Sequence, residues 1–422
     1  MLILPAILVR PAHYLRSRKR LSLVLLILGF FTFVIEPYHH VQTAYPISRP
    51  AKPLDPPYST TCPVGSLADV AASTPRESAV LFMLARNSEA YAAAKTIRNL
   101  EARWNRHYNY PWVLLNDQPW ERGFKAKINA ALSPGTNITF AEIPRSMWGW
   151  PSQFSERQQE KAMATWDRYA RGMTQEFVEG THVQKASYHH MCRFNSGLFY
   201  DHPDIKPYKW YWRVEPGVSF SCDIPYDPFH EMVKRGHRYG YTVALWEVGS
   251  LSPTLFRAAS DFAETLRGKK SALWNAMHDA SWAPWFVRRF VLPLWPSKNR
   301  YGDQWTSCHF WSNFEIADLD FFRGREYRDF FAYLDGLGGF HYERWGDAPV
   351  HSLAAGMLLQ PEEIHYFQDV GYKHPPFQHC PNDVGLGCNC KCDDSKAVNQ
   401  FCLGSVRRPV LPEGTRERAL RG

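Results

Sequence analysis

The sequence predicts an α/β fold with a mixed, mainly parallel sheet, preceded by a single N-terminal membrane helix. The apolar run "SAVLFMLA", residues 78–85, is typical of a strand that is buried on both faces. Apolar residues recur at helical spacing over 87–105, and a second short apolar run follows at 111–117. This strand–helix–strand order is a βαβ unit, which favours a parallel sheet.

The N-terminus predicts a membrane anchor. Residues 1–20 form a basic tail, and the segment 21–37 contains an uncharged apolar run from Leu21 to Ile35. No small-residue cleavage site follows, so a removed signal peptide is the less favoured alternative. Because the basic residues precede the run, the positive-inside rule places residues 1–20 in the cytosol and the body in the lumen. A span this short suits the thinner bilayers of the early secretory pathway.

Residues 38–75 are rich in Pro, Ser and Thr without apolar periodicity, which predicts an extended stem before a lumenal domain at 76–402. Asn137 begins an N-glycosylation triplet, and nine cysteines, five of them after residue 379, suit an oxidising compartment. The "CNCKC" spacing is tighter than usual zinc pairs, so disulfides are favoured. An odd number leaves at least one thiol free or paired between chains.

The charge distribution argues against a nucleic-acid partner. The net charge is +8, but residues 1–20 hold five Arg or Lys without an acid. The basic C-terminal tail, residues 403–422, holds five Arg and two Glu. These two tails account for the whole excess, so the body between them is neutral and a broad phosphate-binding face is not expected.

The rest of the body alternates between strand-like and helix-like segments. Strands are expected at 137–143, 208–216 and 241–248, and helices at 155–178, 253–267, 324–335 and 349–359. The segment 269–300 mixes Trp, Pro and basic residues and predicts a long loop or inserted subdomain. There is no Walker-type or G-x-G-x-x-G loop, so a nucleotide would have to be held differently.

Glu215 is the first candidate for chemistry. It ends the strand-like "KWYWRVEP", and ligands of parallel sheets bind beyond the carboxyl ends of strands. A carboxylate there is costly unless it is paired or binds a cation. Glu215 could hold a divalent metal against a diphosphate, or it could simply pair with Arg213. A D-x-D pattern, Asp318-Leu319-Asp320, is a second and very weak metal signal.

Other acids and histidines leave several possibilities open. Glu315 lies among apolar residues, which fits a nucleophile, a base or a partner of an arginine. Asp347 and His351 precede a helix, where a structural role at the helix start is favoured over metal ligation. No G-x-S-x-G elbow supports a hydrolase. The remaining candidates are Tyr188, His189, His190, Arg193, His365, His374 and His379.

Long stretches resemble a known family. They are "SYHHMCRFNSGLFYDHPDIKPYKWYWRVEPGVSFSCDIPYDPF", "YGYTVALWE", "CHFWSNFEIADLDFFRGREYRDFFAYLDGLGGFHYERWGDAPVHSLAAGMLL" and "IHYFQDVGYKHPPFQHCP". Together they are similar to the fungal α-1,2-mannosyltransferases of glycosyltransferase family 15, from about Ala79 to Cys402 and in the same order. The resemblance implies a GT-A-like fold, GDP-mannose as donor, Mn²⁺ as cofactor and transfer with retention. It also implies a single-pass type II protein of the Golgi membrane.

The resemblance also implies roles for individual residues. The family's E-P motif maps onto Glu215-Pro216, and its second metal ligand maps onto His374. The family's candidate nucleophile corresponds to Glu315, and Asp347 is similar to a second candidate acid.

Three further residues take substrate-binding roles by the same resemblance. Tyr188 looks like the residue that contacts the acceptor mannose, Arg213 lies near the diphosphate, and Arg86 lies near the nucleotide. The segment 269–300 departs from the pattern, because it is longer than the family would lead us to expect. This departure bears on which acceptor is used.

The resulting hypothesis is transfer of mannose from GDP-mannose to a terminal α-mannose of glycoprotein or glycolipid glycans, forming an α-1,2 link. Retention would proceed through a covalent intermediate on Glu315 or through same-face attack, and the sequence leaves both open. The alternative is a lumenal glycan-binding or scaffold protein without catalysis. Such a protein would not need Glu215, Glu315 and His374 together.

Overall fold

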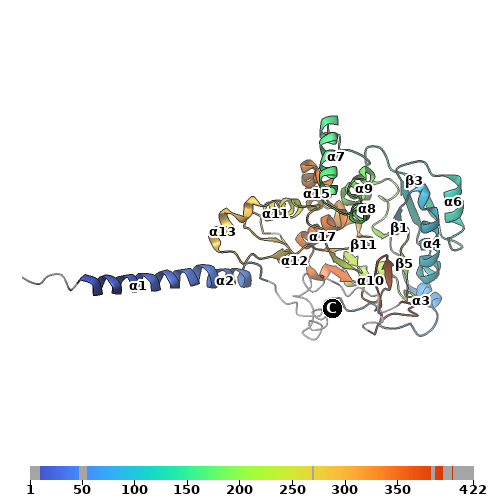
Figure 1. The fold of residues 1–422 in the computed structure, drawn as a ribbon. Coiled ribbons are helices and arrows are strands. Elements are labelled where there is room, and N and C mark those ends of the chain that lie inside the picture. The colour runs from blue at the N-terminus through green and yellow to red at the C-terminus, as the bar shows by residue number, and fades with distance from the viewer. Residues whose placement is uncertain (1–9, 47–54, 269, 382–384, 393–401, 403–422) are drawn as a thin grey trace, which may run out of the picture.

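A long N-terminal helix projects away from a compact α/β body (Figure 1). The computed structural model describes residues 10–46, 55–268, 270–381, 385–392 and 402. The helix runs through α1 (Arg10–Phe30), a π-helical turn η1 (Phe31–Ile35) and α2 (Glu36–Thr43). Within the described part of the chain, Arg20–Thr43 is the one helical stretch long and apolar enough to cross a membrane. It suggests a single-pass anchor.

A seven-stranded sheet forms the centre of the body, in the order β12–β6–β11–β4–β1–β2–β3. Its strands are β1 (Ala79–Leu84), β2 (Trp112–Asn116), β3 (Ile138–Glu142), β4 (Trp210–Val214), β6 (Tyr239–Tyr241), β11 (Phe314–Asp318) and β12 (Ile364–Tyr366). The pairs β1–β2, β1–β4, β2–β3 and β12–β6 are parallel. Only β11 runs antiparallel to its neighbours β4 and β6. The predicted mixed, mainly parallel sheet is therefore confirmed.

Three small sheets surround the central one. They are β7 (Ala244–Trp246) with β10 (Cys308–Phe310), β8 (His278–Asp279) with β9 (Gln304–Trp305), and β5 (Ser219–Phe220), β13 (Tyr372–His374) and β14 (Phe377–His379). The sheet β14–β13–β5 begins just after β4 and brings a C-terminal hairpin to the end of that strand.

Helices cover both faces of the central sheet (Figure 1). One side holds α3 (Leu67–Ser73), η2 (Asn87–Glu89), α4 (Ala90–Leu100), η3 (Glu101–Asn105), α5 (Arg106–Tyr108), α6 (Arg122–Asn129) and α10 (Pro228–Arg235). The other side holds α9 (Ala186–Gly197), η4 (Phe199–Asp201), α11 (Leu255–Thr265), α12 (Ala272–Ala276), α14 (Leu319–Arg323), α15 (Arg325–Leu337), α16 (Gly339–Tyr342) and α17 (Asp347–Leu358). The remaining helices are α7 (Glu156–Ala170), α8 (Gln175–Thr181), α13 (Trp285–Phe290), η5 (Leu292–Leu294) and η6 (Pro361–Glu363).

Strand alternation explains why there are two hydrophobic cores. Val80 and Phe82 of β1 belong to the core under α9 and α17, whereas Leu81 and Met83 belong to the core under α4 and α10. All four side chains are buried, as the continuous apolar run predicted.

Two sequence-based elements differ in the structure. The single helix expected over 155–178 is two helices, because α7 ends at Ala170 and Thr174 starts α8 by accepting a hydrogen bond from the backbone N–H of Phe177. The strand expected over 241–248 is divided between β6 and β7, which belong to different sheets. The hydrophobic periodicity of a short segment does not indicate where the chain ends one helix or leaves one sheet for another.

Three disulfides join the C-terminal segment to the body, Cys62–Cys388, Cys222–Cys390 and Cys308–Cys402, and a fourth, Cys380–Cys392, closes a loop within that segment. The expectation of disulfides in the "CNCKC" cluster is confirmed. The odd cysteine, Cys192 of α9, is a free thiol and is buried. The C-terminal tail at 403–422 lies outside the described residues.

Helix α9 approaches α15 so closely that one position requires glycine. A Cβ added at Gly197 would lie 2.1 Å from the ring of Phe331. We therefore predict that Gly197→Ala lowers the free energy of unfolding by about 1–3 kcal/mol, because Phe331 or the helix must move. Gly123→Ala on α6 is the matched control, since nothing lies within 4 Å of its added Cβ. Thermal unfolding of both variants checks this, and equal melting temperatures would contradict the close packing.

Candidate active site

A cavity of about 530 Å³ opens at the carboxyl ends of the parallel strands β1, β2 and β4. Arg86 follows β1, Asp117 follows β2 and Glu215 follows β4, and all three line the cavity. Parallel strands bring their carboxyl ends to one edge of the sheet, so segments far apart in sequence meet there. Residues of α9 and of the start of α17 also line the cavity.

Arg213 is the centre of a buried ionic cluster on the cavity wall. Its guanidinium donates to the carboxylate of Asp347, and its Nη2 donates to Glu215 Oε1 at 2.6 Å. Ser312 Oγ donates to Asp347 Oδ2 at 2.8 Å. Arg213 comes from β4, Asp347 from the first position of α17 and Ser312 from the turn before β11. The cluster therefore fixes three elements against one another.

The charges of this cluster stabilise one another. Burial alone would raise the pKa values of Glu215 and Asp347, but Arg213 lowers both below their ordinary values. Burial would likewise lower the pKa of Arg213, yet Asp347 and Glu215 raise it above its usual range. Both carboxylates are therefore ionised at neutral pH, and the three groups together carry a net negative charge.

His374, at the end of β13, completes the cluster. Its Nε2 lies 3.5 Å from Glu215 Oε2, and the side chains of Glu215 and His374 are 27% and 29% exposed. Burial would lower the pKa of His374, but its contact with Glu215 raises that pKa above its ordinary value. The two groups face the cavity and supply one oxygen and one nitrogen donor.

Glu215 and His374 could hold a divalent cation only if other ligands completed its coordination. Among the described residues, no group of three or more His, Cys, Asp or Glu side chains is arranged to bind a metal ion. Glu215 and His374 are thus compatible with an ion that takes its other ligands from a bound phosphate and water, as hard cations at phosphate sites commonly do.

Tyr188 of α9 also lines the cavity. Its hydroxyl accepts a hydrogen bond of 2.7 Å from Arg344 Nη2, and the guanidinium of Arg344 lies 4.7 Å from the Tyr188 ring centroid. Burial raises the pKa of Tyr188 well above its ordinary value, so its hydroxyl keeps its proton. The hydroxyl can therefore donate to a ligand oxygen while Arg344 holds it in place.

Glu315 differs from the other predicted site residues, because it does not line the cavity. It lies on β11 directly opposite Arg213 of β4 and is 0% exposed. Its carboxylate accepts from the hydroxyls of Tyr211 and Tyr239 and lies 2.9 Å from His351 Nδ1. Burial raises the pKa of Glu315, although His351 opposes this shift. The structure thus brings Arg86, Tyr188, Arg213, Glu215, Asp347 and His374 together in one cavity and places Glu315 beneath its wall.

The weak D-x-D pattern lies away from the cavity. Asp318 caps α14 by accepting from the backbone N–H of Asp320, and it also contacts Arg238. The Asp320 side chain is 59% exposed and follows the end of β11 that lies far from Glu215. His351, an open candidate in the sequence, bridges Glu315 and the backbone carbonyl of Asn195.

Several residues that line the cavity were not among those predicted from the sequence. Glu247 lines the cavity and follows β7 as Glu215 follows β4, and its carboxylate lies 3.7 Å from Arg344. The position of an acid directly after "ALW" could have identified it. Trp246 and Trp311 also line the cavity, and their flat rings are suited to a sugar. The sequence is rich in aromatic residues, so a tryptophan by itself does not indicate a sugar-binding position.

Comparison with known proteins places this geometry in a family. A sequence model described as glycolipid 2-alpha-mannosyltransferase matches residues 54–405. The O-glycoside alpha-1,2-mannosyltransferase homolog 4 of Schizosaccharomyces pombe is 39% identical over 376 residues, which cover 82% of this chain and 79% of that protein.

Two solved structures have the same fold. Core-mannan synthase A from Aspergillus fumigatus, in its Mn/GDP form, matches with a TM-score of 0.66 and 33% identity over 86% of this chain and 91% of that one. The mannosyltransferase Ktr4p from Saccharomyces cerevisiae, in complex with GDP, matches with a TM-score of 0.70 and 30% identity over 89% and 91%. The chain belongs to the glycolipid 2-alpha-mannosyltransferase family, glycosyltransferase family 15, and is a mannosyltransferase.

Proposed function

We propose that the protein transfers mannose from GDP-mannose to a terminal α-mannose of a glycoprotein or glycolipid glycan, with retention and an α-1,2 link. The observation that carries this proposal is the cluster of Arg213, Glu215 and His374 at the strand ends of the cavity. The relatives with GDP, and in one case Mn, support the same donor chemistry here. The apolar helix and the disulfides support a single-pass protein of the Golgi membrane with a lumenal body.

Glu215 and His374 would hold Mn²⁺, which supplies positive charge to the diphosphate leaving group. Arg213 supports this metal site through its contact with Glu215. It keeps Glu215 ionised and donates to one oxygen of its carboxylate, which leaves the other oxygen facing His374. Arg86, which is exposed at the end of β1, would contact the nucleotide from the neighbouring strand. Asp347 holds Arg213 in position through the second half of the guanidinium.

On the acceptor side, Tyr188 would orient a mannose hydroxyl, because its protonated hydroxyl is fixed by Arg344. The burial of Glu315 supports same-face attack over a covalent intermediate on this residue. Its carboxylate is fully enclosed and already contacts two tyrosine hydroxyls and His351. We assign Glu315 to positioning β11 and α17 behind Arg213.

The metal role of Glu215 gives the first test. Glu215→Gln should abolish Mn²⁺-dependent release of GDP from GDP-mannose with methyl α-mannoside, because the amide is a poorer ligand for a hard cation. The solubilised full chain, assayed with and without Mn²⁺, provides the measurement, and NMR of the product determines anomeric configuration and linkage. Asp320→Asn, in the exposed D-x-D, is the matched control and should retain activity. If Asp320→Asn lost activity while Glu215→Gln kept it, the assignment of the metal to Glu215 would be overturned.

The same site predicts linked binding of metal and nucleotide. Because Glu215 and His374 are the two donors proposed among the described residues, Mn²⁺ should bind weakly alone and at least about tenfold more tightly when GDP is present, which corresponds to about 1.4 kcal/mol. Isothermal titration of Mn²⁺ with and without GDP measures this difference. Equal affinities in both titrations would contradict a metal that is shared between protein and diphosphate.

Glu315→Gln separates positioning from nucleophilic attack. A positioning role predicts that kcat falls by no more than about a hundredfold, whereas removal of a true nucleophile costs on the order of 10⁴-fold or more. The dissociation constant of GDP should stay unchanged, which also verifies that the variant is folded. A larger loss of kcat, together with a mannosylated wild-type peptide in mass spectrometry, would restore the covalent route.

A further inference from the structure

The segment 282–295 carries a cluster of large exposed apolar side chains. Six of them belong to α13, η5 and the residues beside these elements: Trp282, Trp285, Phe290, Val291, Leu294 and Trp295. Leu294 is 79% exposed and Phe290 is 66% exposed. Elsewhere on the body, exposed apolar residues such as Tyr91 and Met163 are scattered singly, which is ordinary. A gathered patch of this kind marks a surface that is covered in the working protein.

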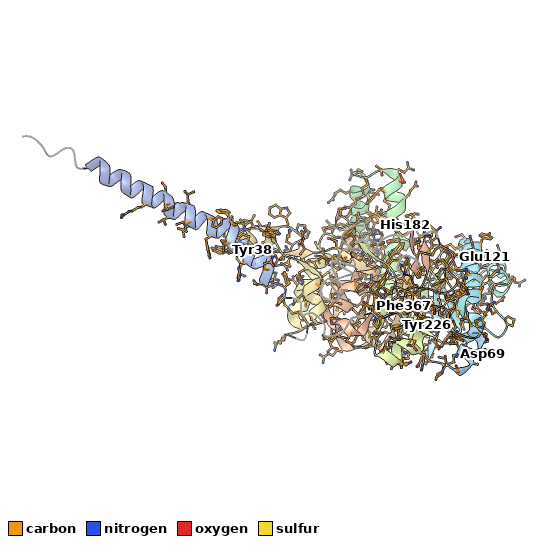
Figure 2. The ribbon with its side chains drawn as sticks, turned by 90° about the horizontal axis from the view of Figure 1, so that it is seen from below. Tyr38, Asp69, Glu121, His182, Tyr226 and Phe367 are labelled. Atoms are coloured by element: carbon orange, nitrogen blue, oxygen red, sulfur yellow. A yellow bond between two sulfur atoms is a disulfide. The ribbon has the colours of Figure 1, made fainter. Side chains whose placement is uncertain are left out.

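This patch lies directly beside the C-terminal end of the apolar helix. The rings of Phe33 and Phe286 meet edge to face at 6.1 Å, and the rings of Tyr38 and Trp282 are 6.3 Å apart. Figure 2 shows Tyr38 where the long helix reaches the body. The patch is therefore continuous with the one helical stretch, among the described residues, that is apolar enough to span a bilayer.

Polar contacts fix the patch against the helix. Glu36 pairs with the guanidinium of Arg288 and accepts a hydrogen bond of 3.0 Å from the backbone N–H of Trp285. Asp303 accepts from Tyr45 at 2.7 Å and lies 3.1 Å from His40. These contacts all involve residues just after the apolar run, where a spanning helix leaves the hydrocarbon. The patch is thus fixed beside the C-terminal end of the apolar helix.

We propose that residues 282–295 form a membrane lobe, which inserts its exposed aromatic and aliphatic side chains into the lumenal leaflet beside the anchor. The proposal rests on the proposed single-pass anchor. Trp and other amphipathic side chains are favoured at the boundary between headgroups and acyl chains, and Arg stems can reach outward from it. The exposed Arg289 next to Phe290 has this arrangement. The lobe resembles an interfacial element more than a second span, because α13 is only six residues long.

The consequence is a second point of attachment. The body would meet the bilayer through the anchor and the membrane lobe together, and this fixes its orientation and its distance from the membrane. The competing occupant of the patch is a second copy of the chain, and the experiment distinguishes the two.

The test uses single reporter cysteines in the full chain, in phosphatidylcholine nanodiscs, since the native free thiol Cys192 is buried. Leu294→Cys reports on the membrane lobe, and Tyr91→Cys, which is 75% exposed on α4, is the matched control. Leu26→Cys in the apolar helix, 70% exposed, reports on the anchor alone. Each is labelled with a bimane fluorophore, and quenching is measured with a nitroxide on an acyl chain near the headgroup.

We expect the label at Leu294 to be quenched at least about threefold more than the label at Tyr91, because only the former lies at the interface. Strong quenching at Leu26 with none at Leu294 would overturn the membrane lobe and leave the anchor standing. No quenching at Leu26 would overturn the anchor and the lobe together. Protection of the Leu294 label from aqueous iodide without lipid quenching would assign the patch to a second copy and overturn the proposal.

Discussion

The structure of the site depends on one buried cation. Arg213 lies between Asp347 and Glu215, so a single guanidinium stabilises two carboxylates that could not otherwise remain ionised out of water. Removal of this cation would leave two adjacent negative charges on the cavity wall, and removal of one carboxylate would leave the other half of the guanidinium without a partner. The fork geometry of arginine serves both at once, which a lysine could not do.

The same cation links parts of the chain that local sequence does not connect. β4 carries Arg213, α17 begins at Asp347 and β13 ends at His374, yet all three meet within one cluster. The antiparallel strand β11 packs against β4 with Glu315 opposite Arg213, and this carboxylate is in turn held by His351 of α17. Two layers of charge therefore lie one behind the other, the first facing the cavity and the second enclosed in the protein.

Much of this could be predicted from the sequence. The continuous apolar runs gave β1 and β2, and a charged residue at the end of a buried strand pointed to Glu215. The ion pair of Glu215 with Arg213 is confirmed, and its metal role stays a prediction that its position beside His374 allows. The family resemblance identified six residues that line one cavity. The domain boundaries expected from the sequence, and the catalytic and binding roles of these six residues, remain predictions.

Other features depend on contacts between distant segments. The enclosure of Glu315 requires the hydroxyls of Tyr211 and Tyr239 and the ring of His351, and no local pattern indicates that they converge. Disulfide pairing is of the same kind, since the "CNCKC" spacing showed that bridges were favoured but not which cysteines they join. Likewise, the apolar patch beside the helix arises only because residues 282–295 fold back to residues 33–45.

The arrangement of the disulfides sets an order on biosynthesis. Cys62 pairs across 326 residues and Cys222 across 168, and both partners lie in the segment 388–390. A chain emerging from the ribosome N-terminus first therefore exposes these thiols long before their partners exist. The domain can be covalently closed only after residues 388–390 have been translated. Until then, Cys62 and Cys222 lack their native partners, and any disulfide they form must be rearranged later.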